Sequence, residues 1–459
     1  MESIQWTPPE SIPKNVQAIP LTMAYLYKRD SDGNITERKA RCDVRGDIMK
    51  PGIHYNPDDT TTFAADKATI RFLLCDASAH QLPTGHFDIS SAFLHELFQH
   101  STLVYVWQHP LFDGTYAHDE STGQLRGNLY GTRQAGKIFC DGARAFLLDH
   151  GFTQTKSDPC LFLKSEPPLQ TLVAVTIDDF LACASTPQLL TKLYSALSTK
   201  YNIKLLGRPT SYLNWKIEHL PSGIKISQPH IVHSVIAKTQ MTNAKPLSNL
   251  YSDGIDMSPP STSETIDETI ATTFRETVGE LRYLTDSTRP NIHFYVNSLA
   301  RANHKPTQRH WKLLKRLIRF LKNTPTTGIT FPTSPLHDPL TAFSDSDFAN
   351  DPQSRKSISG ILHTYHGAPM NWESQRQSIV ALSTFESELM ATADTTRHKN
   401  WLSGMPRELD IIPANHTTIT YTNSQSAIQV ATQTAPTKRR NLIDLRFHYI
   451  IDCIQRRPN

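Results

Sequence analysis

The stretch Leu172-Val173-Ala174-Val175-Thr176-Ile177-Asp178-Asp179-Phe180-Leu181-Ala182-Cys183-Ala184 sets two adjacent carboxylates between two short apolar segments. This pattern predicts a strand, a tight turn and a second strand. The run contains no Lys or Arg that could neutralise Asp178 and Asp179, and two carboxylates at the edge of a core are costly unless a cation joins them. One interpretation is therefore a site for a hard metal ion such as Mg²⁺, which takes oxygen ligands. The other is a solvated hairpin turn, since Asp is a common turn residue.

A second stretch, His86-Phe87-Asp88-Ile89-Ser90-Ser91-Ala92-Phe93-Leu94, predicts a strand that carries Asp88 and runs into a helix. It also lacks a basic residue that could pair with the acid. Three carboxylates on neighbouring strands form the kind of site that binds two metal ions for an in-line displacement at phosphorus. Together the two stretches favour the metal site.

Both stretches, with Asn128-Leu129-Tyr130-Gly131-Thr132-Arg133-Gln134-Ala135 between them, resemble the palm of reverse transcriptases of the copia-type retrotransposon branch. The resemblance implies an RNA-directed DNA polymerase, which is a nucleotidyltransferase with a right-hand arrangement of fingers, palm and thumb. In such an enzyme Asp88 and Asp178 would hold two Mg²⁺ ions, with Asp179 beside them, and Mn²⁺ is an alternative ion. The implied partners are an RNA template, a DNA primer, an RNA–DNA hybrid and deoxynucleoside triphosphates.

A basic hairpin precedes the first acid. The segments 23–28 and 35–46 flank Asp32-Gly33-Asn34, which is a strong hairpin turn signal. In the family this hairpin belongs to the fingers, and Lys39 and Arg41 fall at its basic positions, where cations stabilise a leaving pyrophosphate. A solvated basic strand face is the alternative interpretation.

Two further nucleotide contacts are implied by the resemblance. Phe93 lies five positions after Asp88, where the family places a bulky side chain under the sugar. A ring there would collide with a ribose 2′-hydroxyl and so select deoxynucleotides. The alternative interpretation is that Phe93 is only a residue of the hydrophobic core. The family also sets the Gly-rich loop 127–137, which includes Gln134, against the nucleotide and the template.

Between these motifs and the C-terminal part, the sequence predicts helices at 68–79, 137–150 and 187–206 and a hairpin at 212–227 that resembles the primer-gripping element. Residues 242–270 are rich in Ser, Thr, Pro and Asp, which predicts a linker. The segment 311–322 predicts a helix with one apolar face and with Lys315, Arg319 and Lys322 on other faces. Those cations could follow a nucleic-acid backbone, form a solvated face or lie on a membrane surface.

A second set of acids begins near residue 336. The predicted strand Thr341-Ala342-Phe343-Ser344-Asp345-Ser346-Asp347, a helix that opens near Leu382 and a strand at 418–425 resemble a ribonuclease H domain. The resemblance assigns metal ligands to Asp345, Glu388 and Asp444, and the position that normally holds a further Asp is Asn423. An amide oxygen lacks the charge that holds a second divalent ion, so we expect impaired hydrolysis in an intact fold.

Length and composition fit this organisation. A chain of 459 residues predicts two or three domains, here 1–245 for the fingers, palm and thumb, 246–335 for a linker and connection segment, and 336–459 for a ribonuclease H-like α/β domain. The expected fold is thus α/β and α+β multidomain. No apolar run approaches a membrane span, the start has no signal-peptide pattern, and the six cysteines form no C-x-x-C pair. We expect an intracellular protein that acts without a membrane, in cytoplasmic particles or the nucleus.

Four departures from the family pattern keep a second hypothesis open. Thr176 replaces an aromatic residue, Gly136 a Pro, Asn214 a Gly and Asn423 an Asp. The alternative is a catalytically decayed retrotransposon remnant that only binds nucleic acid; a nuclease with one live site is a weaker alternative. The sequence leaves the primer, a homodimer and processing from a longer polyprotein undecided.

Overall fold

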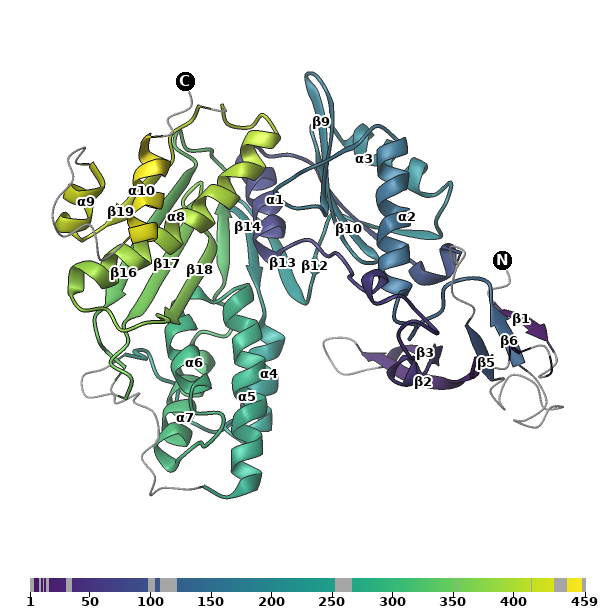
Figure 1. Ribbon diagram of the computed structural model, residues 1–459, viewed down its shortest axis with the longest axis horizontal. Helices are drawn as coiled ribbons and strands as arrows, with labels where there is room; N and C mark the ends of the chain where they lie inside the picture. The colour runs from purple at the N-terminus through teal and green to yellow at the C-terminus, as the bar shows by residue number, and fades with distance from the viewer. Residues whose placement is uncertain are drawn as a thin grey trace. The chain divides into compact units, whose positions relative to one another are not determined.

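The computed structural model (Figure 1) describes residues 4–7, 10, 12–13, 16–29, 35–97, 104–107, 122–251, 266–351, 353–413, 415–432 and 444–455. The chain divides into two compact units: residues 1–66 with 83–208, and residues 67–82 with 209–459. Each unit contains two β-sheets. The protein is therefore a mixed α/β chain with several sheets, as the sequence predicts.

The larger sheet of the first unit has six strands in the order β11-β4-β10-β9-β8-β7, and every neighbouring pair is antiparallel. Its strands are β4 (Thr84–Ile89), β7 (Thr153–Gln154), β8 (Leu161–Glu166), β9 (Leu169–Thr176), β10 (Asp179–Ala184) and β11 (Ile203–Gly207). Strands β9 and β10 form the predicted hairpin around Asp178, and β4 is the predicted strand that carries Asp88. Both predictions of local structure are confirmed.

Two helices, α2 (Ala135–Asp149) and α3 (Pro187–Leu197), cover one face of this sheet (Figure 1). Phe139 of α2 and Leu197 of α3 belong to the same buried cluster as Phe87 of β4 and Phe180 of β10. Because successive side chains of a strand point to opposite faces, the neighbours of Phe87 and Phe180 lie on the face away from these helices. Asp88 and Asp179 are among those neighbours.

The smaller sheet of the first unit has the order β1-β6-β5-β2-β3, in which only β2 and β5 are parallel. Its strands are β1 (Ile4–Thr7), β2 (Ile19–Arg29), β3 (Ile35–Val44), β5 (Tyr105–Trp107) and β6 (Thr122–Leu125). Strands β2 and β3 form the predicted basic hairpin, while its turn Asp32-Gly33-Asn34 lies outside the described residues. Single-turn helices at η2 (Gly46–Ile48) and η3 (Pro57–Asp59) follow β3.

The second unit contains the sheet β12-β13-β14-β15 and a helical bundle. The strands are β12 (Ser211–Tyr212), β13 (Trp215–Leu220), β14 (Gly223–Ser227) and β15 (Ile329–Pro332). The helices are α4 (Pro229–Lys238), α5 (Glu268–Ser287), η5 (Pro290–Ile292), α6 (His293–Ala300) and α7 (Gln308–Asn323). Their apolar faces form one buried cluster, in which Leu314, Leu317, Ile318 and Leu321 of α7 are fully buried. The helix α1 (Lys67–Ala79) also belongs to this unit.

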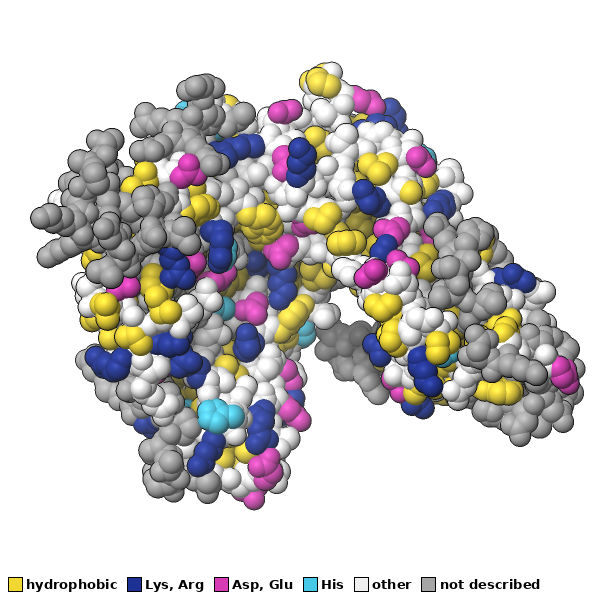
Figure 2. All heavy atoms as spheres, in the orientation of Figure 1, with side chains coloured by type: hydrophobic (Ala, Val, Ile, Leu, Met, Phe, Trp, Pro, Cys, Tyr) yellow, Lys and Arg dark blue, Asp and Glu magenta, His cyan; other side chains and the backbone are white. Residues whose placement is uncertain are grey.

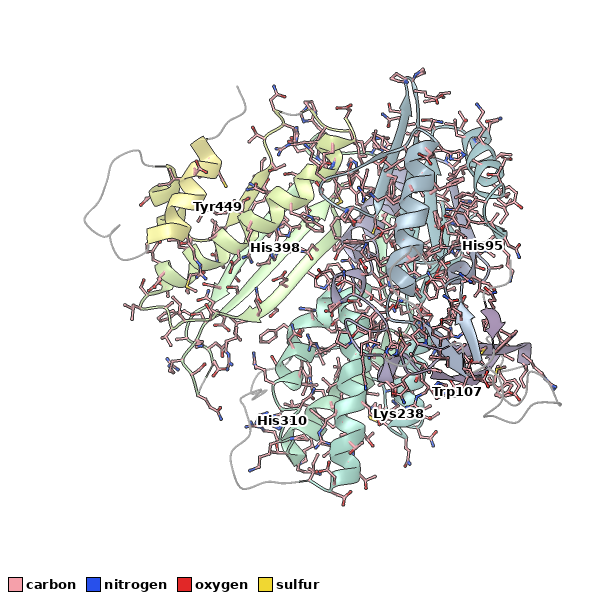
Figure 3. All side chains as sticks on the ribbon, turned by 45° about the vertical axis from the view of Figure 1, so that its right-hand side comes forward. His95, Trp107, Lys238, His310, His398 and Tyr449 are labelled. Carbon is pink, nitrogen blue, oxygen red and sulfur yellow. The ribbon has the colours of Figure 1, made fainter. Side chains whose placement is uncertain are left out.

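The last sheet has the order β18-β17-β16-β19, with β16 and β19 parallel. Its strands are β16 (Leu340–Asp347), β17 (Ile358–Tyr365), β18 (Ala368–Arg376) and β19 (Ile419–Thr422). Helix α8 (Thr384–Glu408) lies on one face, where Thr392 meets Ser344 of β16 at 3.1 Å. Helices α9 (Gln425–Thr432) and α10 (Asp444–Gln455) follow, and Figure 3 labels Tyr449 on α10. Asn400 of α8 donates a hydrogen bond to the hydroxyl of Tyr449 at 3.0 Å.

The structure corrects the prediction of a helix over 187–206. Helix α3 ends at Leu197, and residues 203–207 form the edge strand β11, which pairs with β4. Ser198 and Thr199 turn their hydroxyls back onto the carbonyls of Tyr194 and Ala196, which ends the helix. Similarly, the residues after β4 form only the short 3₁₀ turn η4 (Ala92–His95) instead of an α-helix.

The predicted linker 242–270 is also corrected in its first part. Residues 242–251 lie along helix α7, whose Arg316 and Arg319 donate hydrogen bonds to the carbonyls of Leu250 at 2.8 Å and Lys245 at 2.7 Å. The side chain of Leu250 is buried in the helical bundle. Residues 252–265 lie outside the described part of the chain. No described helix has the length and apolar character needed to cross a membrane.

Candidate active site

Asp88 and Asp179 face each other across two neighbouring strands. They are direct Cα partners in the antiparallel pair of β4 and β10, so their side chains project from the same face of the sheet. Asp178 occupies the two-residue turn that joins β9 to β10, and its carbonyl accepts a hydrogen bond from the amide of Ile89 at 2.9 Å. The structure therefore brings the three predicted acids of the first site together at one end of the sheet.

The turn that carries Asp178 is strained. Ile177 has a φ of 54°, which is a left-handed conformation that β-branched residues rarely adopt. Such a residue costs on the order of 1–3 kcal/mol and persists only where its surroundings hold it. Thr176, which stands opposite Asp179 at the base of the turn, has a buried hydroxyl oxygen with no hydrogen-bond partner in the described structure. The turn thus fixes Asp178 at a cost in stability.

The electrostatic environment of Asp178 is unfavourable for its negative charge. Burial raises the pKa of this carboxyl above its ordinary value, and the charges of Asp179 and Asp88 raise it further. The ammonium group of Lys39 acts in the opposite direction. Lys39 of the basic hairpin is therefore close enough to the acids to interact with them.

Sequence reasoning did not single out His86. Its Nε2 lies 3.1 Å from Oδ1 of Asp179, and its side chain is almost completely buried. The signal that could have found it is the strand period of two, because His86 and Asp88 are two positions apart and must share a face.

Tyr130 connects the basic hairpin to the acids and was also missed as a candidate. The Arg41 guanidinium lies 4.7 Å from the centre of the Tyr130 ring, and the Phe93 ring lies 4.9 Å from it. Burial raises the pKa of Tyr130, with a further contribution from the charge of Asp178. Arg41 also forms an ion pair with Asp43 at 2.8 Å. Arg41, Phe93 and Tyr130 thus form one contact chain beside the acids.

Two glycines allow this close approach of the hairpin and the loop. A Cβ on Gly46 would lie 1.9 Å from the carbonyl oxygen of Gly131, and Gly131 itself has a φ of 87°. The amide of Val44 donates to the carbonyl of Tyr130 at 2.7 Å, and Arg133 donates to the carbonyl of Gly46 at 2.7 Å. A side chain at either glycine would push the loop and the hairpin apart.

Gln134 takes a structural position within the loop. Its side chain is buried, its Nε2 donates to the carbonyl of His54 at 3.3 Å, and its Oε1 has no partner among the described residues. At Gly136 a Cβ would lie 2.5 Å from the Thr62 hydroxyl oxygen. The small residue at 136 therefore suits the packing of this chain.

Asn214 likewise fits its local backbone. It follows Leu213 in the turn between β12 and β13. The φ value is 49° at Leu213 and 58° at Asn214. Asn tolerates the left-handed region better than other non-glycine residues, because its short polar side chain can bond locally. The departure from Gly at this position therefore preserves the turn.

The second predicted acid set lies in the sheet of β16 and β19. Nδ2 of Asn423 donates a hydrogen bond to Oδ1 of Asp345 at 3.1 Å. Burial raises the pKa of Glu388 at the start of α8, and the charge of Asp345 raises it further. Asp345, Glu388 and Asn423 are thus neighbours. Asp444 begins helix α10, but its side chain lies outside the described part of the structure.

Among the described residues, Asp76, His80 and His366 also lie within metal-ligand distance of one another. The backbone N–H of Leu336 donates to Nδ1 of His366 at 2.9 Å, which places the ring proton of a neutral imidazole on Nε2. A metal-bound imidazole needs the opposite arrangement, with its second nitrogen as the donor. The geometry therefore argues against a metal ion at this cluster.

The site and the sheets define a mixed α/β protein with an acid cluster at strand ends. Residues 9–250, more than half of the chain, match the family described as reverse transcriptase (RNA-dependent DNA polymerase). The chain belongs to the reverse transcriptase family.

Several curated proteins resemble this chain over most of its length. The Retrovirus-related Pol polyprotein from transposon TNT 1-94 of Nicotiana tabacum is 29% identical over 450 residues, which cover 96% of this chain and 33% of that protein. The corresponding polyprotein from transposon RE2 of Arabidopsis thaliana is 29% identical over 446 residues, covering 96% of this chain and 30% of that protein. An uncharacterised mitochondrial protein of Arabidopsis thaliana is 33% identical over 229 residues, covering 50% of this chain and 92% of that protein. The predicted resemblance to copia-type Pol polyproteins is confirmed, and the chain spans about a third of the length of those polyproteins.

Proposed function

We propose that the chain is an RNA-directed DNA polymerase of a retrotransposon, which extends a DNA primer on an RNA template and carries an impaired ribonuclease H-like domain. The observation that carries the proposal is the convergence of Asp88, Asp178 and Asp179 at one end of the six-stranded sheet. The family and the Pol polyprotein relatives support the same class of reaction. The template, the primer, the RNA–DNA hybrid and the deoxynucleoside triphosphates are partners within this proposal.

The chemistry of the donor set fits two Mg²⁺ ions, with Mn²⁺ as a substitute. Three carboxylates supply hard oxygen ligands, and burial together with the charges of Asp179 and Asp88 raises the pKa of Asp178, an effect that a bound cation would oppose. Asp88 and Asp178 would hold the ions, with Asp179 beside them. Divalent ions in such a site activate the attacking hydroxyl and stabilise the charge that develops on the phosphate.

The surrounding residues have roles that follow from their positions. The triphosphate would be bound by Lys39 and Arg41. Lys39 interacts electrostatically with Asp178, and the Arg41 guanidinium lies over the Tyr130 ring. Phe93, whose ring contacts Tyr130, would lie under the sugar and exclude a 2′-hydroxyl. The buried Gln134 would support the loop that lines the nucleotide site.

In the C-terminal part we propose a ribonuclease H-like domain with Asp345, Glu388 and Asp444 as metal ligands. Its support is the sheet order β18-β17-β16-β19, with the parallel pair β16 and β19, and helix α8 on one face. The amide of Asn423 at the position of a normal acid supports impaired hydrolysis. The division at 1–245, 246–335 and 336–459 remains part of the proposal.

The test is Mg²⁺-dependent extension of a DNA primer on an RNA template, with an Asp178→Asn variant as control. We expect extension by the natural sequence and a loss of at least about 10²-fold in the variant, because one carboxylate of the metal site is removed. Salt-sensitive template binding without extension would instead favour a decayed remnant that only binds nucleic acid. The hydroxyl oxygen of Thr176 beside the acids is buried and has no hydrogen-bond partner among the described residues, and this observation favours the second candidate.

A further inference from the structure

We propose that His86 is a positioning residue that fixes the carboxylate of Asp179 beside Asp88 and Asp178, and so maintains the affinity of the site for divalent ions. The inference rests on the proposed polymerase function, because it assigns a role within the same site. His86 stands in the stretch that carries Asp88, but neither the pattern nor the family resemblance assigns it a role.

The register of two strands brings the two side chains together. In the pair of β4 and β10, His86 is opposite Leu181 and Asp88 is opposite Asp179. Paired residues share a face, and so do residues two positions apart on one strand, so His86, Asp88 and Asp179 all project from the same face of the sheet. Nε2 of His86 reaches Oδ1 of Asp179 at 3.1 Å.

The burial of the two partners is unequal, which gives the contact a direction. The His86 side chain is 8% exposed, whereas that of Asp179 is 34% exposed. The imidazole is therefore enclosed by its surroundings, while the carboxylate is partly exposed to solvent. A fixed donor that binds a more exposed acceptor restricts the acceptor, so the ring orients the carboxylate rather than the reverse.

The contact leaves the metal-binding capacity of Asp179 in place. Nε2–H donates to Oδ1, so this hydrogen bond does not itself use Oδ2. The interaction requires only a hydrogen on Nε2, which both the neutral Nε2–H tautomer and the charged ring carry. Hydrogen bonds from outer residues to metal-binding groups typically alter metal affinity or activity by 10- to 100-fold.

The experiment measures metal binding separately from catalysis. Mn²⁺ binding to the full chain is followed by electron paramagnetic resonance without nucleic acid, and the Mg²⁺ concentration for half-maximal primer extension is measured in parallel. We expect His86→Leu, which removes the donor but fills the volume, to weaken Mn²⁺ binding about 10-fold and to raise the Mg²⁺ requirement similarly. At saturating Mg²⁺ its maximal rate should recover most of the natural value.

Two matched variants separate orientation from packing. The amide of His86→Gln can still reach Asp179, so this variant should bind Mn²⁺ within about 3-fold of the natural protein. The shorter side chain of His86→Asn is polar but cannot reach Asp179, so this variant should bind Mn²⁺ as weakly as His86→Leu. It replaces His86→Leu in the test if the leucine variant does not fold. In an Asp179→Asn background, His86→Leu should cause no further loss of Mn²⁺ binding, because the residue acts through Asp179.

The outcomes distinguish this inference from the polymerase proposal. If the natural protein binds Mn²⁺ through Asp178 but does not extend a primer, the polymerase proposal fails and the His86 variants still decide the present inference. Unchanged Mn²⁺ affinity in both His86→Leu and His86→Asn would overturn it and leave His86 a packing residue. Absence of Mn²⁺ binding that depends on Asp178 would overturn it as well.

Discussion

Nδ2 of Asn423 donates a hydrogen bond of 3.1 Å to Oδ1 of Asp345, so an amide is bound to the first acid of the proposed nuclease site. An amide lets the two side chains approach without charge repulsion when no metal ion is present. The same amide supplies less negative charge to a divalent ion than a carboxylate does. The contact is thus compatible with an undisturbed fold and with the weak hydrolysis that we propose.

Asn423→Asp should restore hydrolysis of the RNA strand in an RNA–DNA hybrid. We expect an increase of at least about 10-fold in Mg²⁺-dependent cleavage, since one further charged ligand is worth several kcal/mol in the transition state. Cleavage of a 5′-labelled RNA measures it, and Asn423→Ser, which adds no charge, is the matched control. An equal rate in the aspartate and serine variants would show that residue 423 does not limit this site.

Phe93→Ala should relax the selection against ribonucleotides. The Phe93 ring is held between Tyr130 at 4.9 Å and Phe139 at 6.2 Å, and its removal opens space where a 2′-hydroxyl would lie. We expect the ratio of deoxynucleotide to ribonucleotide incorporation to fall by roughly 5- to 150-fold, the range given by about 1–3 kcal/mol of steric discrimination.

Single-nucleotide incorporation with paired triphosphates measures this ratio. Phe93→Tyr keeps the ring and should keep the selection, which makes it the control. If alanine lowers the incorporation of both nucleotides equally, Phe93 is a core residue and the steric role is wrong.

Asp351→Asn should remove a pH-dependent contribution to stability. The side chain of Asp351 is fully buried and accepts hydrogen bonds from the amide and hydroxyl of Ser354 and from Arg376. Burial alone would raise its pKa, but these donors outweigh burial and lower the pKa from 3.8 to about 2. Because the folded-state pKa is lowered, the stabilisation is present above about pH 4 and is lost as the pH falls toward 2.

The shift corresponds to about 2 kcal/mol, which Asp351→Asn should lose at pH 7. Denaturant unfolding at pH 7 and at about pH 2.5 measures the difference, and it should be much smaller at the lower pH. Asp410→Asn, at an exposed aspartate, is the control. A difference between the variant and the natural protein that stays constant across this pH range would contradict the assigned cause.

The local patterns around the acids predicted the site strands well. Alternating and apolar runs with turn residues identify β4, β9 and β10, because strand periodicity and turn chemistry are local properties. The contact between His86 and Asp179 depends on the register of two strands 93 positions apart in sequence, which no local pattern specifies. The edge strand β11 was missed for a similar reason, since its pairing with β4 overrides a weak helical pattern.

The predicted linker shows a different limit. Its composition is polar, and composition alone predicts a chain without a packed partner. The carbonyls of residues 245, 249 and 250 instead accept hydrogen bonds from Arg316 and Arg319. The sequence pattern placed Arg319 only on a polar face of the helix and assigned no role to Arg316. A polar segment can therefore be ordered by side chains of a helix that is distant in sequence. Neither the sequence of the segment nor that of the helix predicts this contact by itself.

This interaction divides the cations of helix α7 into two groups with different expected functions. Arg316, Arg319 and Lys322 donate to main-chain carbonyls of 242–250, whereas Lys312 and Lys315 are exposed. On the face shown in Figure 2, acidic and basic side chains are interspersed over the helical bundle and do not form one continuous basic patch. A nucleic-acid contact on α7 therefore depends on the exposed lysines.

Replacing Lys312 and Lys315 together by Gln should weaken binding of an RNA–DNA hybrid and reduce its salt dependence by about one unit of slope for each phosphate that is no longer neutralised. Replacing Arg316 and Arg319 together by Gln should instead lower the free energy of unfolding by roughly 1–3 kcal/mol, because one part-buried and two exposed carbonyls lose charged donors. Fluorescence anisotropy over a salt series and denaturant unfolding measure the two effects on both variants. A stable Arg316 and Arg319 variant with a reduced salt slope would mean that these arginines bind nucleic acid and that their bonds to residues 245–250 are incidental.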